Sequence, residues 1–143
     1  MYHYGTRSLG RLNTCHDLLQ TLAHELIKHR DVTILEGHRG KQDQNKYFEQ
    51  GRSKVKWPNG KHNSLPSLAV DMCPYPIPDW AFSPKTHDER QMARDFWVGW
   101  GNYVKGVAAA MGIRIRWGGD WNRDFMPDRF FDAPHFELEG DQT

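Results

Sequence analysis

The sequence is poor in cysteine and has no long apolar run, and both absences narrow the classes of protein to consider. It holds two cysteines in 143 residues, Cys15 and Cys73, with no Cys-x-x-Cys spacing, which is too few for a disulfide framework. We therefore expect two buried thiols in a protein made in a reducing cytosol. No stretch approaches the roughly 18 consecutive apolar residues that a membrane-spanning helix needs.

An excess of one charge and a leader pattern are also missing. The net charge of +1 does not indicate nucleic-acid binding, and the basic residues are not interleaved with aromatics as on single-strand-binding surfaces. The N-terminus has no charged start followed by an apolar run, so we expect no secretory signal. Aromatic side chains, by contrast, are abundant at 13% of the chain. They predict an ordered protein with an aromatic core, and the length suits one domain.

The spacing of apolar residues predicts a mixed fold. Helical periodicity predicts helices over residues 14–29 and 88–111, and a polar helix that ends before Gly51 is expected over residues 42–50. Thr14 with Asp17 resembles a capping box at the start of the first helix. Short strands are expected over residues 32–35, 68–72, 113–117 and 135–138, with a proline-rich loop after the second. Because helices and strands do not alternate strictly, we predict an α+β fold with a small antiparallel sheet flanked by helices.

Two of the eight histidines stand in contexts that suggest chemistry. His62 precedes a strand-like run in which Asp71 lies between Val70 and Met72. A carboxylate among apolar neighbours needs a partner, and a metal ion or an arginine would serve equally well. We expect structural roles for the histidines other than His62 and His135.

The second context lies near the C-terminus. Pro134 restricts the backbone of Ala133 and can hold Asp132 and His135 toward one cavity. Two histidines and one aspartate would leave a fourth tetrahedral position for water, as in catalytic rather than structural zinc sites. Zinc lowers the pKa of such a water toward 7, and Asp132 is the candidate to take its proton. The spacing alone is too irregular to count as a metal motif.

Three blocks of the sequence occur in an order typical of one enzyme family. The central block runs from His62 to Asp71, with Pro-Ser shortly before Ala-Val-Asp. The early block comprises Glu36-Gly37-His38-Arg39, Gln44 and Gly51-Arg52-Ser53-Lys54. The late block comprises Trp117-Gly118-Gly119-Asp120-Trp121 and Asp132-Ala133-Pro134-His135-Phe136-Glu137. Together they resemble the zinc D-alanyl-D-alanine carboxypeptidases and L-alanyl-D-glutamate peptidases, in the form found in phage endolysins, across nearly the whole chain.

The resemblance implies a role for each matching residue. It implies that His62, Asp71 and His135 bind Zn²⁺, that Asp132 is the general base, and that Arg39 contacts substrate. A surface salt bridge is the alternative for Arg39. Asp120 would accept a hydrogen bond from a ligand histidine or cap the turn that precedes it. Trp117 and Trp121 would line the groove or belong to the core. Further candidates to contact substrate or support the ligands are Gln44 and Ser53.

The implied function is hydrolysis of bacterial peptidoglycan by a zinc endolysin that cuts the stem peptide between L-Ala and D-Glu. The implied fold is of the hedgehog and D,D-peptidase type, with residues 1–143 as one catalytic domain and no separate wall-binding domain. One alternative is a D-Ala-D-Ala carboxypeptidase with the same metal site, and another is a non-catalytic, zinc-containing wall-binding module. We further expect a monomer, made in the host cytoplasm and released to the wall through a holin-type pore.

Overall fold

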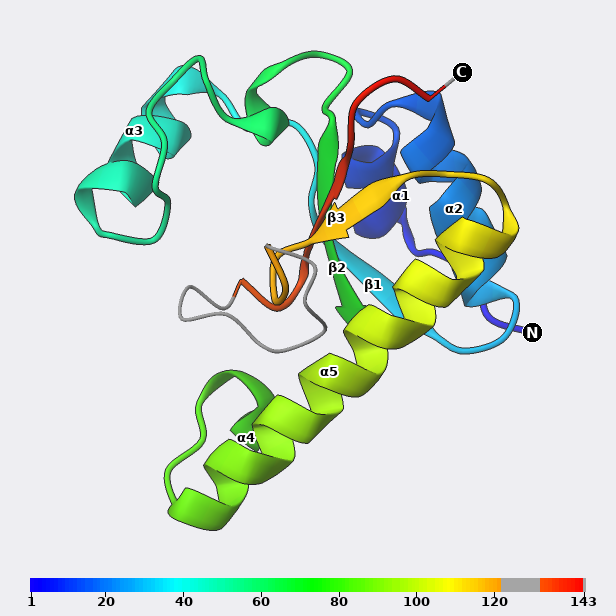
Figure 1. The fold of residues 1–143 in the computed structure, drawn as a ribbon, viewed down its shortest axis with the longest axis vertical. Coiled ribbons are helices and arrows are strands. Elements are labelled where there is room, and N and C mark those ends of the chain that lie inside the picture. The colour runs from blue at the N-terminus through cyan, green and yellow to red at the C-terminus, as the bar shows by residue number, and fades with distance from the viewer. Residues whose placement is uncertain (122–131, 143) are drawn as a thin grey trace.

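The computed structural model describes residues 1–121 and 132–142, which fold around a four-stranded antiparallel sheet (Figure 1). The strands, in the spatial order β1-β2-β4-β3, are Val32–Glu36 (β1), Ala69–Pro74 (β2), Ile115–Trp117 (β3) and His135–Leu138 (β4). The helices are Thr6–Leu12 (α1), Asp17–Ile27 (α2), Lys41–Glu49 (α3), Asp79–Phe82 (α4) and His87–Ala110 (α5), with a 3₁₀ turn, η1, over Lys61–Asn63. The predicted α+β fold with an antiparallel sheet is confirmed.

Helix α5 supplies much of the apolar core that backs the sheet. Its residues Trp97 and Trp100 are both buried. The Trp100 indole N–H donates to the carbonyl oxygen of Met72 on β2 at 3.0 Å, and its ring meets that of Phe136 on β4 at a centroid distance of 6.4 Å. The Tyr103 hydroxyl donates to the Leu26 carbonyl oxygen at 3.1 Å and so joins α5 to α2. These contacts make β2 and β4 the firmly packed centre of the molecule.

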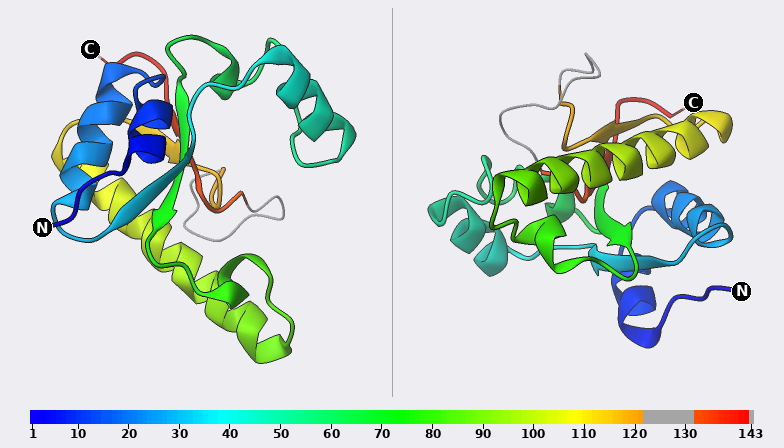
Figure 2. Two further views of the ribbon diagram at one scale, coloured as in Figure 1. Left: turned by 180° about the vertical axis from the view of Figure 1, so that it is seen from behind. Right: turned by 90° about the horizontal axis from the view of Figure 1, so that it is seen from below.

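Helix α3 and the loop that follows it project away from this core (Figures 1 and 2). We call residues 41–60 the arm. Of the nine residues of α3, Gln44 is the buried one, and its two aromatic residues, Tyr47 and Phe48, are only partly buried. Apolar burial therefore contributes little to holding the arm, and side-chain hydrogen bonds take that role.

The first predicted helix is confirmed, but its predicted start is wrong. Helix α2 begins at Asp17, and its N-cap is His16, whose Nδ1 accepts a hydrogen bond from the Leu18 N–H at 3.0 Å. The Thr14 hydroxyl instead donates to the Arg11 carbonyl oxygen at 2.6 Å and accepts from the His38 N–H at 2.8 Å. Thr14 thus joins the end of α1 to the turn after β1 rather than capping α2.

Two helices were not predicted, and both are short. Helix α1 includes Gly10 and has one buried residue, Leu12, so its sequence pattern is faint. It packs along β1, where the Ile34 N–H donates to the Ser8 hydroxyl at 3.1 Å and Arg11 donates to the Ile34 carbonyl oxygen at 3.0 Å. Helix α4 is a single turn inside the expected proline loop, and Pro74 belongs to the end of β2.

The structure bears on two of the sequence expectations, the state of the cysteines and membrane-spanning helices. Cys15 and Cys73 are buried free thiols. Among the described residues, no helix combines the length and apolarity needed to cross a membrane.

Candidate active site

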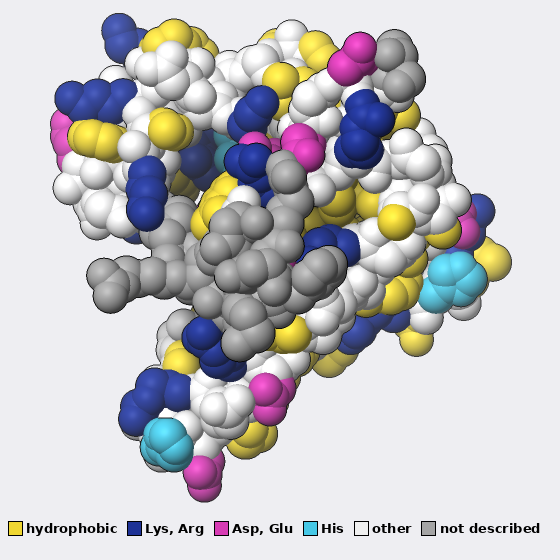
Figure 3. All heavy atoms as spheres, viewed as in Figure 1, with side chains coloured by type: hydrophobic (Ala, Val, Ile, Leu, Met, Phe, Trp, Pro, Cys, Tyr) yellow, Lys and Arg dark blue, Asp and Glu magenta, His cyan; other side chains and the backbone are white. Residues whose placement is uncertain are grey.

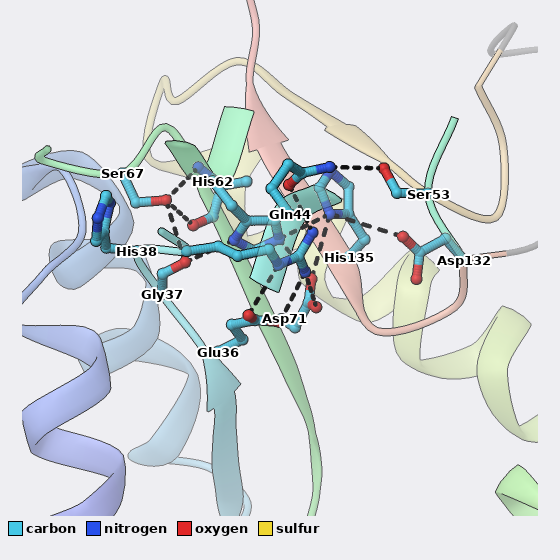
Figure 4. A network of polar contacts seen from close by, with 12 residues as sticks. Glu36, Gly37, His38, Gln44, Ser53, His62, Ser67, Asp71, Asp132 and His135 are labelled. Carbon is cyan, nitrogen blue, oxygen red and sulfur yellow. Dashed lines mark hydrogen bonds and ion pairs between the residues drawn. The ribbon is translucent and has the colours of Figure 1, made fainter. Parts of the chain in front are cut away.

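The sheet register brings the predicted ligands together. Asp71 on β2 pairs directly with His135 on β4, so their side chains project from the same face. His62 approaches from the η1 turn, which is fixed by a hydrogen bond from the Arg39 N–H to the His62 carbonyl oxygen at 2.7 Å. His62 Nε2 lies 3.1 Å from Asp71 Oδ1 and 3.2 Å from His135 Nδ1, and the last two atoms are 3.2 Å apart (Figure 4). All three ligand atoms lie within 4.8 Å of one another.

The outward-facing nitrogen of each imidazole ring has its own acceptor. His62 Nδ1 lies 2.7 Å from the Gly37 carbonyl oxygen, and His135 Nε2 lies 2.9 Å from Glu137 Oε1. When those nitrogens carry the protons, the inward nitrogens present lone pairs toward Asp71. Acceptors behind metal-bound histidines fix the tautomer and the ring orientation in this way.

The cluster needs a positive charge at its centre. Burial alone lowers the pKa of His135, but hydrogen bonds to Asp71 and Glu137 outweigh burial and raise it to about 10. Burial of Asp71 opposes ionisation, yet the two histidines hold the pKa of that carboxyl well below its usual range. Without a metal ion, a proton supplies the charge that binds these groups together. The donor set of two imidazole nitrogens and one carboxylate suits a divalent transition metal, zinc among them.

Asp132 stands at the rim of the cluster, and its Oδ2 is 3.8 Å from His135 Nδ1. Burial, followed by the negative charge of Asp71, raises the pKa of the Asp132 carboxyl to about 6. Gly118 fixes its position: the Asp132 N–H donates to the Gly118 carbonyl oxygen at 2.8 Å, and the Gly118 N–H donates to the His135 carbonyl oxygen at 2.8 Å. A Cβ at Gly118 would collide with the Asp132 backbone, so glycine is needed there for close approach.

Arg39 is held beside the cluster by a polar network. Its Nε and Nη2 donate to the two carboxylate oxygens of Glu36 at 2.8 and 2.7 Å, and Nη1 donates to Gln44 Oε1 at 3.1 Å. Nη2 also lies 3.8 Å from Asp71 Oδ2. The paired Glu36 keeps the guanidinium charged, since it raises the pKa of Arg39 although burial alone would lower it. The surface salt bridge considered for Arg39 is thus a mostly buried ion pair next to the ligands.

Gln44 ties the arm to the ligand-bearing turn. Its Oε1 also accepts from Asn63 Nδ2 at 2.9 Å, while its Nε2 donates to Ser53 Oγ at 2.9 Å and to the Val55 carbonyl oxygen at 2.7 Å. The amide therefore makes all the bonds it can make while buried. The structure assigns Gln44 and Ser53 to the support of Arg39 and of the turn next to His62.

The remaining candidates divide. Trp121 lies over the site, with its ring centroid 5.3 Å from that of His135. Trp117 is a core residue, because it is 3% exposed and its indole N–H donates to the Ala133 carbonyl oxygen at 2.7 Å. Asp120 is not the acceptor for a ligand histidine, since Gly37 and Glu137 hold those positions. Its carboxylate is buried 3.6 Å from Lys105 Nζ, and its own N–H donates to the Trp117 carbonyl oxygen.

A cleft of about 1320 Å³ opens onto the cluster. The arm forms one wall, with Tyr47 and Arg52, and helices α4 and α5 form another, with Phe82 and Arg90. Figure 3 shows Lys and Arg side chains both on the arm and at the N-terminal end of α5. The cleft is thus a basic channel with an acidic and histidine-rich floor.

Comparison with known proteins decides the family. Residues 1–139 match the family described as phage L-alanyl-D-glutamate peptidase. The chain belongs to this family. The resemblance found in the sequence is thereby confirmed, and the protein is a peptidase.

A solved structure shares the fold of this family member. The crystal structure of Serratia marcescens L-Ala D-Glu endopeptidase ChiX matches with a TM-score of 0.66 at 23% sequence identity, over 97% of this chain and 90% of that chain. The two proteins therefore share an arrangement of sheet and helices despite low identity.

Behind the two histidines, Glu137 and Gly37 have roles that sequence analysis did not find. Glu137 is on β4 two positions after His135, and residues two apart on a strand share a face. That periodicity was the available signal for Glu137. Gly37 acts through its carbonyl oxygen, which no side-chain pattern reveals.

Proposed function

We propose that this peptidase cleaves the amide bond between L-Ala and D-Glu in peptidoglycan stem peptides, with a bound divalent transition metal, Zn²⁺ in the first instance. The observation that carries the proposal is the convergence of His62, Asp71 and His135 on one point at the floor of the cleft. The description of the matched family names the bond. Family membership favours the enzyme over a non-catalytic wall-binding module.

His62 Nε2, Asp71 Oδ1 and His135 Nδ1 would hold the metal. When bound, such an ion polarises a carbonyl group and makes water acidic enough to act as a nucleophile near neutral pH. The chain's own part is to fix the ligands: Gly37 and Glu137 orient the two rings. The β2–β4 pairing fixes the carboxylate beside them.

Asp132 is the proposed general base and, afterwards, the general acid. Its carboxylate would take a proton from the attacking water and deliver it to the nitrogen of the departing D-Glu. Its position 3.8 Å from His135 Nδ1 supports this role, because a proton acceptor must lie next to the reacting atoms without occupying a ligand position.

Arg39 is proposed to stabilise negative charge that develops on the substrate carbonyl oxygen. Its three side-chain hydrogen bonds to Glu36 and Gln44 use one N–H each on Nε, Nη1 and Nη2. A guanidinium has five N–H groups, so one remains on each terminal nitrogen. Because Glu36 fixes the plane of the group, these two donors are oriented before substrate arrives.

The biological setting follows from the family and stays a prediction. We propose a monomer with one catalytic domain that reaches the wall from the host cytoplasm through a holin-type pore. Gel filtration and lysis assays with added protein, inside and outside intact cells, check these points separately.

Purified peptidoglycan provides the decisive test. The protein is stripped with a strong chelator, reloaded with Zn²⁺, and its products are analysed by mass spectrometry. We expect activity in the reloaded protein alone and fragments with new N-terminal glutamate. Free D-Ala as the main early product would instead identify a carboxypeptidase, and full activity in metal-free protein would exclude the metal-dependent reaction.

A further inference from the structure

Tyr47 of the arm carries two guanidinium groups on one ring. The Arg39 guanidinium carbon lies 4.6 Å from the ring centroid and that of Arg52 lies 4.2 Å from it. Both distances are within the range in which a cation is attracted to the aromatic ring. All three residues line the cleft. Arg52 is thus linked through Tyr47 to Arg39, which lies beside the cluster of His62, Asp71 and His135.

Arg52 is held in place by its backbone as well as by the ring. The N–H groups of Arg52 and Ser53 both donate to the Tyr47 carbonyl oxygen, at 2.8 and 3.2 Å. Gly51, with φ of 73°, makes the turn that allows this return. The Ser53 hydroxyl is in turn bonded to Gln44. Arg52 is therefore a positioned side chain rather than a freely moving surface arginine.

Arg39 and Arg52 differ in whether a carboxylate of the protein neutralises their charge. Glu36 neutralises Arg39 with two hydrogen bonds. Within residues 1–121 and 132–142, no carboxylate pairs with Arg52, whose side chain is exposed to the cleft. The acidic residues among the described lining, Glu36, Asp71, Asp132 and Glu137, all lie in or beside the cluster. Arg52 thus offers an uncompensated, planar set of donors that matches a carboxylate.

We propose that Arg52, stacked on Tyr47, binds a carboxylate of the substrate and selects the D-glutamyl residue on the leaving side of the cut. This inference rests on the proposed function. A glutamyl residue has two carboxyl groups, and a linear chain uses one of them in a peptide bond. The other stays next to the scissile amide, and Arg52 is the positioned cation that it meets.

The test compares two soluble stem peptides that differ in one group. One contains L-Ala–D-Glu with the second carboxyl free, and the other has that carboxyl converted to an amide. We expect kcat/KM of the Zn²⁺-loaded wild type to be about 10–100-fold higher for the free carboxylate, as for a lost hydrogen bond between charged groups. Arg52→Ala should lower kcat/KM for the carboxylate peptide toward the amide value, and Arg52→Lys should retain part of the preference.

Lys46→Ala is the matched control, since it removes one exposed positive charge from α3, the helix that carries Tyr47, at a position outside the cleft lining. It should keep the full preference. Thermal unfolding and metal content, measured for every variant, show whether Arg52→Ala has kept its fold and its metal.

Three outcomes would overturn the inference while leaving the proposed function intact. The wild type could cleave both peptides equally, or Arg52→Ala could slow both peptides by the same factor. The preference could also survive in Arg52→Ala and vanish in Arg90→Ala, which would move the carboxylate to the opposite wall. A metal-loaded wild type that releases no N-terminal glutamate or glutamine from either peptide would remove the proposed function, and this inference with it.

Discussion

The sheet and the arm both contribute side chains to the cleft, and they are held in place by different forces. Asp71 alternates along β2 with Val70 and Met72, and His135 precedes Phe136; all three apolar neighbours are fully buried. The proposed ligands Asp71 and His135 therefore stand on strands whose other face is packed against an aromatic core. The arm has Gln44 as its buried helical residue and depends on hydrogen bonds to Arg39, Asn63 and Ser53.

This difference suggests a division of labour. The reacting atoms need positions fixed to a fraction of an ångström, which a close-packed core provides. Substrate recognition as proposed for Arg52 needs a charge on the arm that hydrogen bonds and the Tyr47 ring hold in position. If the division holds, changes on the sheet side alter metal content or kcat, whereas changes on the arm alter KM and leave the metal in place.

The largest effect is expected on the sheet side from Asp132→Asn. It removes the proton acceptor but none of the three ligands, so kcat should fall by about 10²–10⁴ while bound zinc stays at the wild-type level. His135→Ala is the comparison, since it should lose metal and activity together. Kinetics and metal analysis on the same samples separate the two results. Nearly full activity in Asp132→Asn would show that another group moves the proton.

A smaller loss is expected from Glu137→Ala, which takes away the acceptor behind His135. Removing such an acceptor costs about 10–100-fold in metal affinity. Glu137→Gln keeps an oxygen in place and should lose less. Competition with a chromogenic chelator measures the affinity, and Glu49→Ala on the exposed face of the arm is the control. Unchanged affinity in Glu137→Ala would mean that the strand alone orients the ring.

Much of the sheet side could be predicted from the sequence, for a physical reason. Asp71 lies between two apolar strand residues, where an unpaired carboxylate is costly to bury. His135 follows Pro134, which restricts the local backbone. Those signals singled out Asp71 and His135 but left a metal ion and an arginine as equal partners, and the roles as metal ligands were implied by the family resemblance. The spatial order of the strands could not be predicted, because pairing across β2 and β4 joins residues 64 positions apart. The pairing of β3 with β4, which sets Trp117 opposite Phe136, could not be predicted either, and it places Trp117 in the core.

The arm was harder to predict. Its helix was found from its polar pattern, but the bonds of Gln44 depend on how residues 39, 53, 55 and 63 meet in space. The cation pair on Tyr47 likewise depends on a turn at Gly51 that returns Arg52 to the ring. Side-chain networks of this kind leave no periodic trace in a sequence.

The arm itself is tested by Gln44→Leu, which preserves approximate volume and removes all four hydrogen bonds. Burying unpaired partners costs about 1–3 kcal/mol in the free energy of unfolding. KM should rise because Ser53, next to Arg52, loses its support, while Arg39 keeps its two bonds to Glu36 and the zinc content should not change. Gln42→Leu, at an exposed position of the same helix, is the control for added apolar surface. Loss of zinc in Gln44→Leu would contradict the division between arm and sheet.

The smallest expected effect is a pH dependence of the free energy of unfolding, caused by the two buried thiols of the core. Burial raises the pKa of both Cys15 and Cys73 to about 12, from an ordinary value of 9.0. Folded thiols thus keep their protons where unfolded thiols lose them, so the free energy of unfolding must fall as the pH rises above 9. At pH 9.5 the loss is about 0.8 kcal/mol for each thiol. Denaturant unfolding of the zinc-loaded protein at pH 7.5 and 9.5 measures it, and Cys73→Ala should remove about half. A thiol reagent that labels the native protein rapidly at pH 8 would show that the core opens far more readily than this packing implies.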